Sequence, residues 1–278
     1  MRQFLFDAVR FENVGGQAMD SYNRRVLDLA MGAGKILLQS GAEIFRVEET
    51  IRRISRHYGV ENSNAFVLSN GIFLTGQDQM GEMYAYVKHI PISGTQLNKV
   101  DAVNRLSREI EQGLDLELAE KKLRHIKIMP GKKPLTLVGA SAVGAGAFCY
   151  IIGGMAGDCL AAVLAGGIVG LYQILMGRRK KATSKLALNL VGAFLATALS
   201  LLFYRLRIGL DYRAITVGAI MPMLPGVSFV TSIRELANGD YIAGTIRLLD
   251  TLLVTAGIAM GVGLFYILYY EITGGYML

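Results

Sequence analysis

Two prolines and a glycine interrupt an apolar stretch that is long enough to cross a membrane. Pro222, Pro225 and Gly226 fall in the middle of residues 215–240, ITVGAIMPMLPGVSFVTSIRELANGD. A proline inside a helix removes a backbone hydrogen bond, and hydrocarbon has no water to satisfy the freed carbonyl. Such backbone persists only against protein or beside a wet cavity. The spacing therefore predicts a broken helix that lines a substrate path, with a purely structural kink as the simpler alternative.

The polar residues around this break indicate what it would bind. Backbone N–H groups at the start of the second half-helix carry partial positive charge, which attracts an anion such as a carboxylate. Two hydroxyl side chains follow, then an arginine near the predicted cytosolic end, and one asparagine lies in the preceding apolar segment. We predict that the substrate-binding residues are Pro222, Pro225, Gly226, Ser228, Thr231, Arg234 and Asn189.

Ionisable residues in the apolar half are candidates for coupling or gating. Asp158 lies near the start of one apolar segment, and Arg247 and Asp250 are three residues apart in the last one. An ionisable group inside a bilayer is costly unless it is paired or hydrated. Asp158 and Arg247 are close enough to segment ends to reach the headgroups, whereas Asp250 is deeper. For Asp250 a structural ion pair with Arg247 and a proton or substrate relay are both open.

A charged helical face in the first half is a second candidate for gating. Glu43, Arg46, Glu48 and Arg52 lie within SGAEIFRVEETIRRI, where the last two are four residues apart and share a helix face. Such a face could be a gate, a small-molecule sensor or a docking surface. A plain solvated helix face is the competing interpretation.

The residues that usually mark enzymes and metal sites do not form a known motif. His57, His89 and His125 occur outside any H-E-x-x-H, and the chain has no G-x-S-x-G, C-x-x-C or Walker loop. Cys149 and Cys159 lie in apolar segments, where free buried thiols are favoured and a bridge between them stays open. We therefore predict no catalytic residue, no cofactor and no metal.

Charge is distributed unevenly along the 278 residues. Residues 1–133 hold 19 Lys+Arg and 16 Asp+Glu, whereas residues 134–278 hold 10 and 6. The net charge of +7 is too weak and too mixed with acids to indicate nucleic-acid binding. We predict two domains, a soluble one over 1–133 and a membrane domain over 134–278.

The second domain contains five apolar segments, each close to the roughly 20 residues that a membrane helix needs. Basic residues precede the first segment and follow the second, which places the soluble domain in the cytoplasm and the C-terminus outside. Arginines 205, 207 and 213 weaken this assignment without reversing it. The start of the chain lacks the apolar core of a signal peptide. The predicted spans are 135–152, 155–176, 185–204, 212–233 and 242–270.

The first domain has the pattern of a small α/β domain. Apolar residues at helical spacing predict helices over 26–37, 42–58, 97–110 and 116–128, with Gly41 ending the first. Residues 66–68 and 72–75 flank Asn70-Gly71, which predicts a hairpin, and 83–92 is a further strand. The fold class is thus an α-helical integral membrane protein with five transmembrane helices, preceded by a small α/β cytosolic domain.

Small residues at a spacing of four predict close helix packing in the membrane domain. The pairs are Gly153/Gly157, Gly166/Gly170, Gly257/Gly261 and Ala140/Gly144.

Several ungapped segments together resemble the threonine/serine exporter family. They occur in the family's order and cover most of the chain; they are SGAEIFRVEETIRRI (40–54), FVLSNGIFLTG (66–76), AVNRLSREI (102–110) and MPMLPGVSFVTSIRELANGDYIAGTIR (221–247). The resemblance implies a cytosolic domain and a membrane part of two five-helix halves, fused or split between two proteins. It also implies export driven by the proton-motive force, of threonine and serine or, in a split branch, of dicarboxylates such as succinate.

We therefore expect a subunit of a secondary exporter in the inner cell membrane, and no enzyme. Its expected partners are a short second membrane subunit, further copies of itself, or both, together with a small carboxylate-bearing substrate and the lipid bilayer. The alternatives are a membrane-anchored cytosolic sensor or scaffold and a membrane-tethered hydrolase. Only the broken helix distinguishes transport from anchoring, because an anchor needs no irregular backbone at membrane depth.

Overall fold

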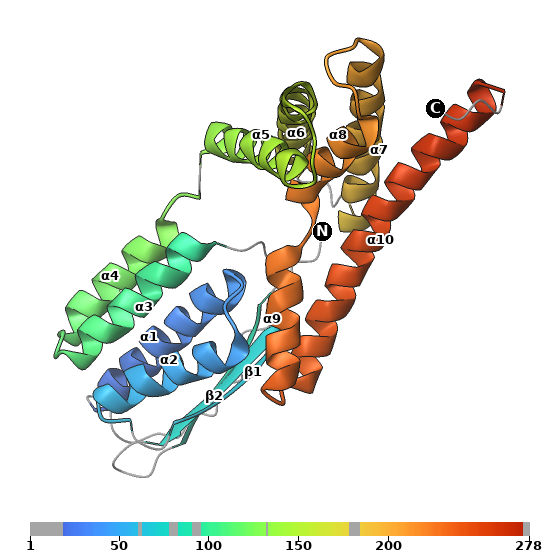
Figure 1. Cartoon of the computed structure of the whole chain (residues 1–278). Coiled ribbons are helices and arrows are strands. Elements are labelled where there is room, and N and C mark those ends of the chain that lie inside the picture. Colours follow the sequence, from blue (N-terminus) through green and yellow to red (C-terminus); the bar gives the residue numbers. More distant parts are fainter. Residues whose placement is uncertain are drawn as a thin grey trace, which may run out of the picture. The chain divides into compact units, whose positions relative to one another are not determined.

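The computed structural model describes residues 19–60, 63–77, 83–90, 96–131, 133–177 and 184–274. The chain forms two compact units (Figure 1). Unit 1 comprises Met1–Gly131 and Ile233–Ile246, and unit 2 comprises Lys132–Ser232 and Arg247–Leu278. The basic residues 132 and 178–181 and the C-terminal residue 278, on which the predicted orientation depends, lie outside the described residues.

Unit 1 is built from amphipathic helices stacked on a small sheet. Helices α1 and α2 cover the sheet, and α3 and α4 pack on α1 and α2 (Figure 1). The first helix ends where predicted, because Gly41 adopts a φ of 80° that L side chains disfavour. The buried stripe of α2, with Val47, Ile51 and Ile54, is the predicted apolar face. The helix bounds are α1 (Met19–Gln39), α2 (Ile44–His57), α3 (Leu97–Glu111) and α4 (Leu116–Ile128).

The sheet is an antiparallel meander of the strands β1 (Asn64–Leu68), β2 (Gly71–Gln77) and β3 (Met83–His89). The predicted hairpin is confirmed, but its turn lies one residue earlier than expected. Leu68 pairs with Gly71, so the two loop residues are Ser69 and Asn70. Alternation sends Val67, Ile72 and Leu74 into the core.

The second segment of unit 1 comes from far along the chain. Ile233–Ile246 contains the end of α9 (Gly226–Ala237) and the start of α10 (Tyr241–Ile272). Ala243 is 1% exposed and belongs to the core of unit 1. Gly244 lies so close to Leu236 that an added Cβ would meet its side chain and backbone at 2.7–2.9 Å. The turn between α9 and α10 is therefore an integral part of this unit.

Unit 2 is a helical bundle whose elements match the predicted spans within a few residues. Four helices are long and apolar enough to cross a membrane, and a fifth span exists if a bent pair, Tyr212–Met223 with Gly226–Ala237, counts as one. The elements are α5 (Pro134–Ile151), α6 (Ala156–Gly177), α7 (Lys185–Arg205), α8 (Tyr212–Ile220), the short 3-10 helix η1 (Met221–Met223), α9 and α10.

Glycines let these helices approach closely, as predicted for two of the pairs. A Cβ on Gly170 would lie 2.9 Å from Ser141 Cβ of α5, and a Cβ on Gly257 would lie 3.0 Å from the Leu186 carbonyl of α7. Gly153 and Gly157 do not share a helix face, so that prediction is wrong. Gly153 has a φ of 94° and ends α5 in a turn, because only glycine adopts that conformation freely. Cys149 and Cys159 are free thiols, in line with the favoured interpretation.

Substitution of two glycines of α10 tests this packing, because we expect one variant to be more stable and the other less stable than the wild type. A Cβ on Gly261 would meet the Leu190 carbonyl and Ala193 of α7, whereas Gly263 has nothing within 4 Å. Gly263→Ala should therefore raise stability by up to about 1 kcal/mol through helix propensity, and Gly261→Ala should lower it by about 1–3 kcal/mol through overpacking. Thermal unfolding of the two variants in detergent measures the difference. Equal shifts of the same sign would refute the α7–α10 contact.

Candidate functional site

The predicted break in the fourth apolar segment is present. The axes of Tyr212–Met223 and Gly226–Ala237 differ by 57°. Pro222 lies in η1, and Pro225 directly precedes the first residue of α9. The first hydrogen bond of α9 runs from the Phe229 N–H to the Pro225 carbonyl at 3.0 Å. The N–H groups of Val227 and Ser228 precede that bond, so α9 itself offers them no acceptor.

Glycines on two neighbouring helices lie beside η1, the first part of the break. A Cβ on Gly192 of α7 would lie 2.8 Å from Met223 Cε and 3.5 Å from a ring carbon of Tyr172 on α6. On α5, the corresponding distance from Gly144 to Pro222 Cγ is 3.8 Å. The side chains of η1, the first part of the break, are therefore packed against protein, whereas Leu224 and Gly226 after it are exposed.

Asn189 lies on the face of α7 that carries Gly192. It lies three residues before Gly192 and is 9% exposed. Its Nδ2 donates to the Lys185 carbonyl at 2.8 Å, and its Oδ1 accepts from Gln173 Nε2 at 3.5 Å, the outer limit of a hydrogen bond. Tyr172 precedes Gln173 on α6, and a Cβ on Gly192 would lie 3.5 Å from the tyrosine ring, at the position that also meets Met223 of η1.

A polar stripe continues from the break along α9. Ser228, Thr231, Ser232 and Glu235 recur at helical spacing, and all four are buried or half-buried. Ser232 and Glu235 are almost fully buried. Val227, Val230 and Ile233 on the other side are exposed apolar residues. α9 therefore turns its polar side inward, which is the orientation expected of a helix that lines a path.

Arg234, predicted to attract the substrate, pairs with a residue predicted to gate. Its Nη1 lies 2.6 Å from Glu43 Oε1, across 191 residues of sequence. Arg46 Nε lies 3.3 Å from Glu43 Oε2. Arg234, predicted to bind substrate, and Glu43 and Arg46, predicted to gate, therefore meet at the start of α2, inside unit 1.

The other two residues of the charged face on α2 are arranged differently. Glu48 Oε1 accepts a hydrogen bond from the Val67 N–H at 3.0 Å and so ties α2 to β1. Arg52 is exposed. The geometry gives Glu48 a structural contact and leaves Arg52 on the solvated side of the helix.

Asp158 connects two loops of unit 2. Its carboxylate accepts hydrogen bonds from the backbone N–H groups of Met155 (2.9 Å), Leu210 (2.6 Å) and Asp211 (2.9 Å), and the residue is 2% exposed. Asp211 in turn caps α8 by accepting from Arg213 and Ala214. Asp158 therefore lies at the opposite end of α8 from the break, about 15 Å away along the helix.

Asp250 forms an ion pair with a partner that the sequence did not suggest. Lys185 Nζ at the start of α7 lies 3.0 and 2.9 Å from the two Asp250 oxygens. The Arg247 carbonyl accepts from the Thr251 hydroxyl one turn along α10. The Lys185–Asp250 pair joins α7 to α10 and is partly exposed, so it has little stabilising effect in water.

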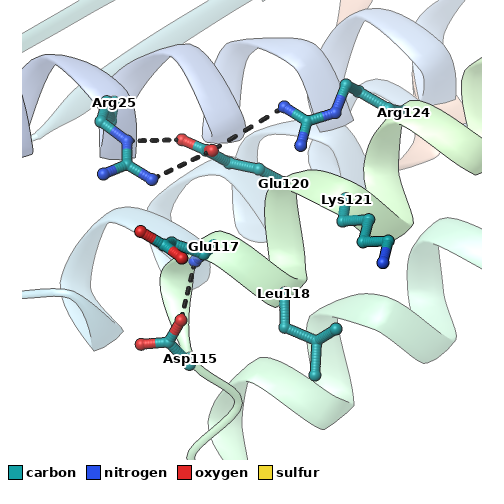
Figure 2. A pocket seen from close by; sticks show the side chains of 7 residues that line it. All are labelled: Arg25, Asp115, Glu117, Leu118, Glu120, Lys121 and Arg124. Carbon is teal, nitrogen blue, oxygen red and sulfur yellow. Dashed lines mark hydrogen bonds and ion pairs between the residues drawn. The ribbon is translucent and has the colours of Figure 1, made fainter.

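A separate charged cleft of about 410 Å³ lies in unit 1 between α1 and the start of α4. Figure 2 shows Arg25 and Arg124 directed toward Glu120, and Asp115 capping α4 at the Glu117 N–H. The hydrogen bond and charge of Glu120 raise the pKa of Arg25. Because these charges are paired with one another, the cleft is a weaker candidate than the break. It is lined by Arg25, Asp115, Glu117, Leu118, Glu120, Lys121 and Arg124.

Sequence reasoning missed Tyr172, Met223 and Gly192 because each looks like an ordinary membrane-helix residue. Their role follows only from packing, which places Met223 in the notch beside Gly192. Among the residues that the structure describes, no group of three His, Cys, Asp or Glu side chains is placed to hold a metal.

The sequence of this chain is similar to sequences of known membrane exporters. Residues 28–269 match the threonine/serine exporter family. A protein named "Threonine/serine exporter" from Corynebacterium glutamicum is 29% identical over 248 residues, which are 86% of this chain and 50% of that protein. A Mycobacterium tuberculosis protein named "Probable threonine/serine exporter" is 24% identical over 258 residues, 92% of this chain and 48% of that protein. This chain thus spans about half the length of these two relatives.

A relative of similar length has a different name. "Probable succinate transporter subunit YjjP" from Klebsiella aerogenes is 27% identical over 252 residues, which are 88% of this chain and 95% of that protein. No solved structure matches this chain.

Replacing Asp158 tests whether its carboxylate is structural. Asp158→Ala removes an acceptor of three backbone N–H groups, and each such bond to a charged group contributes about 1.5–3 kcal/mol. We expect a clear fall in the thermal midpoint in detergent. Asp250→Ala, which removes a partly exposed ion pair, is the matched control with a small expected effect. An Asp158→Ala protein of unchanged stability that no longer transports would instead indicate a coupling role.

Proposed function

The chain belongs to the threonine/serine exporter family, and we propose that it is a subunit of a secondary exporter for small carboxylate-bearing solutes. The observation that carries the proposal is the broken helix α8–η1–α9, whose η1 segment packs beside Gly144 of α5 and Gly192 of α7. Transporters place substrate sites at such breaks because the freed backbone groups can bind polar ligands there. No enzymatic activity is proposed.

The start of α9 suits a carboxylate. The N–H groups of Val227 and Ser228 precede the first helical hydrogen bond, and the positive end of the helix dipole lies with them. Ser228 and Thr231 add hydroxyl donors on the inward side of α9. Asn189, with Gln173 and Tyr172, can hydrogen-bond a second polar group of the substrate.

The names of the relatives suggest two substrates, and both fit this chemistry. Threonine and serine carry a carboxylate, an ammonium and a hydroxyl, whereas succinate carries two carboxylates. The neutral amides near the break match a hydroxyl group as well as an ionised one. Because the sequence has no Walker motif, we propose that an ion gradient drives export.

We propose that unit 2 crosses the cell membrane five times, with the bent pair as the fourth span. α10 has 32 residues, about 48 Å, which exceeds the roughly 30 Å of hydrocarbon. Its first residues, up to Ile246, belong to unit 1, which leaves about 39 Å for a tilted span. Basic residues 127, 132 and 133 at the start of the first span favour unit 1 in the cytoplasm and the C-terminus outside.

The match to half of the longer relatives supports a two-part assembly. We propose that a second, short membrane subunit, further copies of this chain, or both supply the rest of the transporter. The full-length match to a protein named as a transporter subunit is in line with this proposal.

The first test of the path removes the break. Pro222→Ala with Pro225→Ala restores two N–H donors and should straighten the α8–α9 connection. We expect export of threonine or succinate from inverted membrane vesicles to fall by about tenfold or more, the effect of losing one or two polar contacts with the substrate. Pro134→Ala is the control, because Pro134 occupies the first turn of α5, where its missing N–H has no helical partner. Export by the double variant at the wild-type rate would exclude the break as the site.

Orientation can be tested separately. Reporter fusions after residue 133 and after residue 278 should report opposite sides of the membrane, because an odd number of spans separates them. Reporters on the same side would contradict the five-span proposal and leave the four unbroken helices as the spans.

The two-part assembly predicts that the purified chain is not active as a monomer. Co-purification from its native membranes should recover a short membrane protein or an oligomer of this chain, and only that complex should export in proteoliposomes. Robust export by a sample shown to be monomeric would contradict the assembly proposal without affecting the proposed path.

A further inference from the structure

The Glu43 carboxylate has an unusual environment for a surface helix. Its side chain is 10% exposed, and one oxygen, Oε1, is 2.6 Å from Arg234 Nη1. The other oxygen, Oε2, is buried and accepts no hydrogen bond from the described residues. Arg46 Nε lies 3.3 Å from Oε2 without hydrogen-bonding geometry. A buried acceptor of this kind is costly unless a donor reaches it.

Arg234 has the opposite character. Its side chain is 56% exposed although one N–H is fixed by Glu43. A guanidinium has five N–H donors in a planar fork that matches a carboxylate. Arg234 therefore retains donors for a solute while Glu43 holds it in place.

The pair lies on the helix that begins at the break. Arg234 is eight residues after Gly226 on α9, a distance of about 12 Å along the helix. Both members of the pair belong to unit 1. Thus α9 has donors for a carboxylate at its first turn and again two turns later.

We propose that Glu43 and Arg234 together bind the head group of an α-amino acid, with its carboxylate on Arg234 and its ammonium on Glu43. This inference rests on the proposed export function and adds a loading site to it. Glu43 is paired with Arg234 and also lies 3.3 Å from Arg46. A zwitterion inserted between Glu43 and Arg234 replaces their ion pair with two new ones and leaves the net charge of the site unchanged.

The same site favours a zwitterion over a dicarboxylate. One carboxylate of succinate could bind Arg234, but the second would be repelled by the Glu43 carboxylate and would compete with it for Arg46. A hydroxy acid without an ammonium would bind Arg234 and leave Glu43 with Arg46 as its remaining charged partner. The site thus recognises the ammonium group, which the break does not.

The test compares ligands that differ in that group. Labelled L-threonine, 3-hydroxybutyrate and succinate are each tested for export in inverted vesicles that carry this chain, and the unlabelled solutes then compete with whichever of them is exported. The wild type should prefer threonine. Glu43→Gln keeps the shape of the side chain and removes its charge, so the preference for threonine over 3-hydroxybutyrate should fall by about tenfold, the contribution of one charge-assisted bond. Glu43→Asp should restore part of it.

Two further variants separate recognition from folding. Arg234→Gln should weaken both monocarboxylates by about tenfold or more, because both lose the guanidinium. Glu49→Gln removes the exposed Glu49–Arg53 pair of the same helix and should change neither affinity nor preference. Thermal midpoints of all variants in detergent identify any that fail to fold.

Each outcome decides the inference. A Glu43→Gln protein that loses threonine and 3-hydroxybutyrate equally would show that the pair is only a structural latch. A wild type that prefers succinate, with export intact, would overturn the amino-acid site and leave the exporter function standing. Export of none of the three solutes would overturn the proposed function itself.

Discussion

Backbone hydrogen bonding in hydrocarbon is the constraint on which unit 2 depends. Pro222 and Pro225 remove two donors in the middle of an apolar segment. Small residues on α5 and α7 bring those helices against η1, the first part of the resulting break, and Met223 lies beside Gly192. Other glycines hold α5 on α6, through Gly170, and α7 on α10, through Gly257 and Gly261. Close packing and irregular backbone are therefore two parts of one arrangement.

The break also determines what α9 can do. Since the helix restarts at Gly226, it has a free N-terminal turn, an inward polar side and an arginine at its far end. An unbroken helix would have the polar side and the arginine but no free N-terminal turn. The pairing of Arg234 with Glu43 then ties the end of α9 to the first turn of α2 within unit 1.

Hydropathy and helical periodicity predicted most of the elements, because the helices of unit 2 are long, apolar and separated by short polar loops. The break was predictable for a similar reason, since proline acts locally. Contacts between distant residues were not predictable from pattern. Glu43 pairs with Arg234, 191 residues away, and Lys185 pairs with Asp250, 65 residues away. Asp158 looked like an intramembrane acid but accepts backbone N–H groups from a loop that local sequence does not specify.

The central claim, that the inward side of α9 lines a hydrated path, can be tested by thiol accessibility. In a background with Cys149→Ala and Cys159→Ala, cysteines at 228 and 231 are compared with one at 229, where Phe229 lies on the exposed apolar side. A membrane-impermeant thiol reagent should label positions 228 and 231, threonine or succinate should slow that labelling, and position 229 should stay unreactive in lipid. The account would be contradicted if the reagent labelled position 229 but not positions 228 and 231, both with and without substrate.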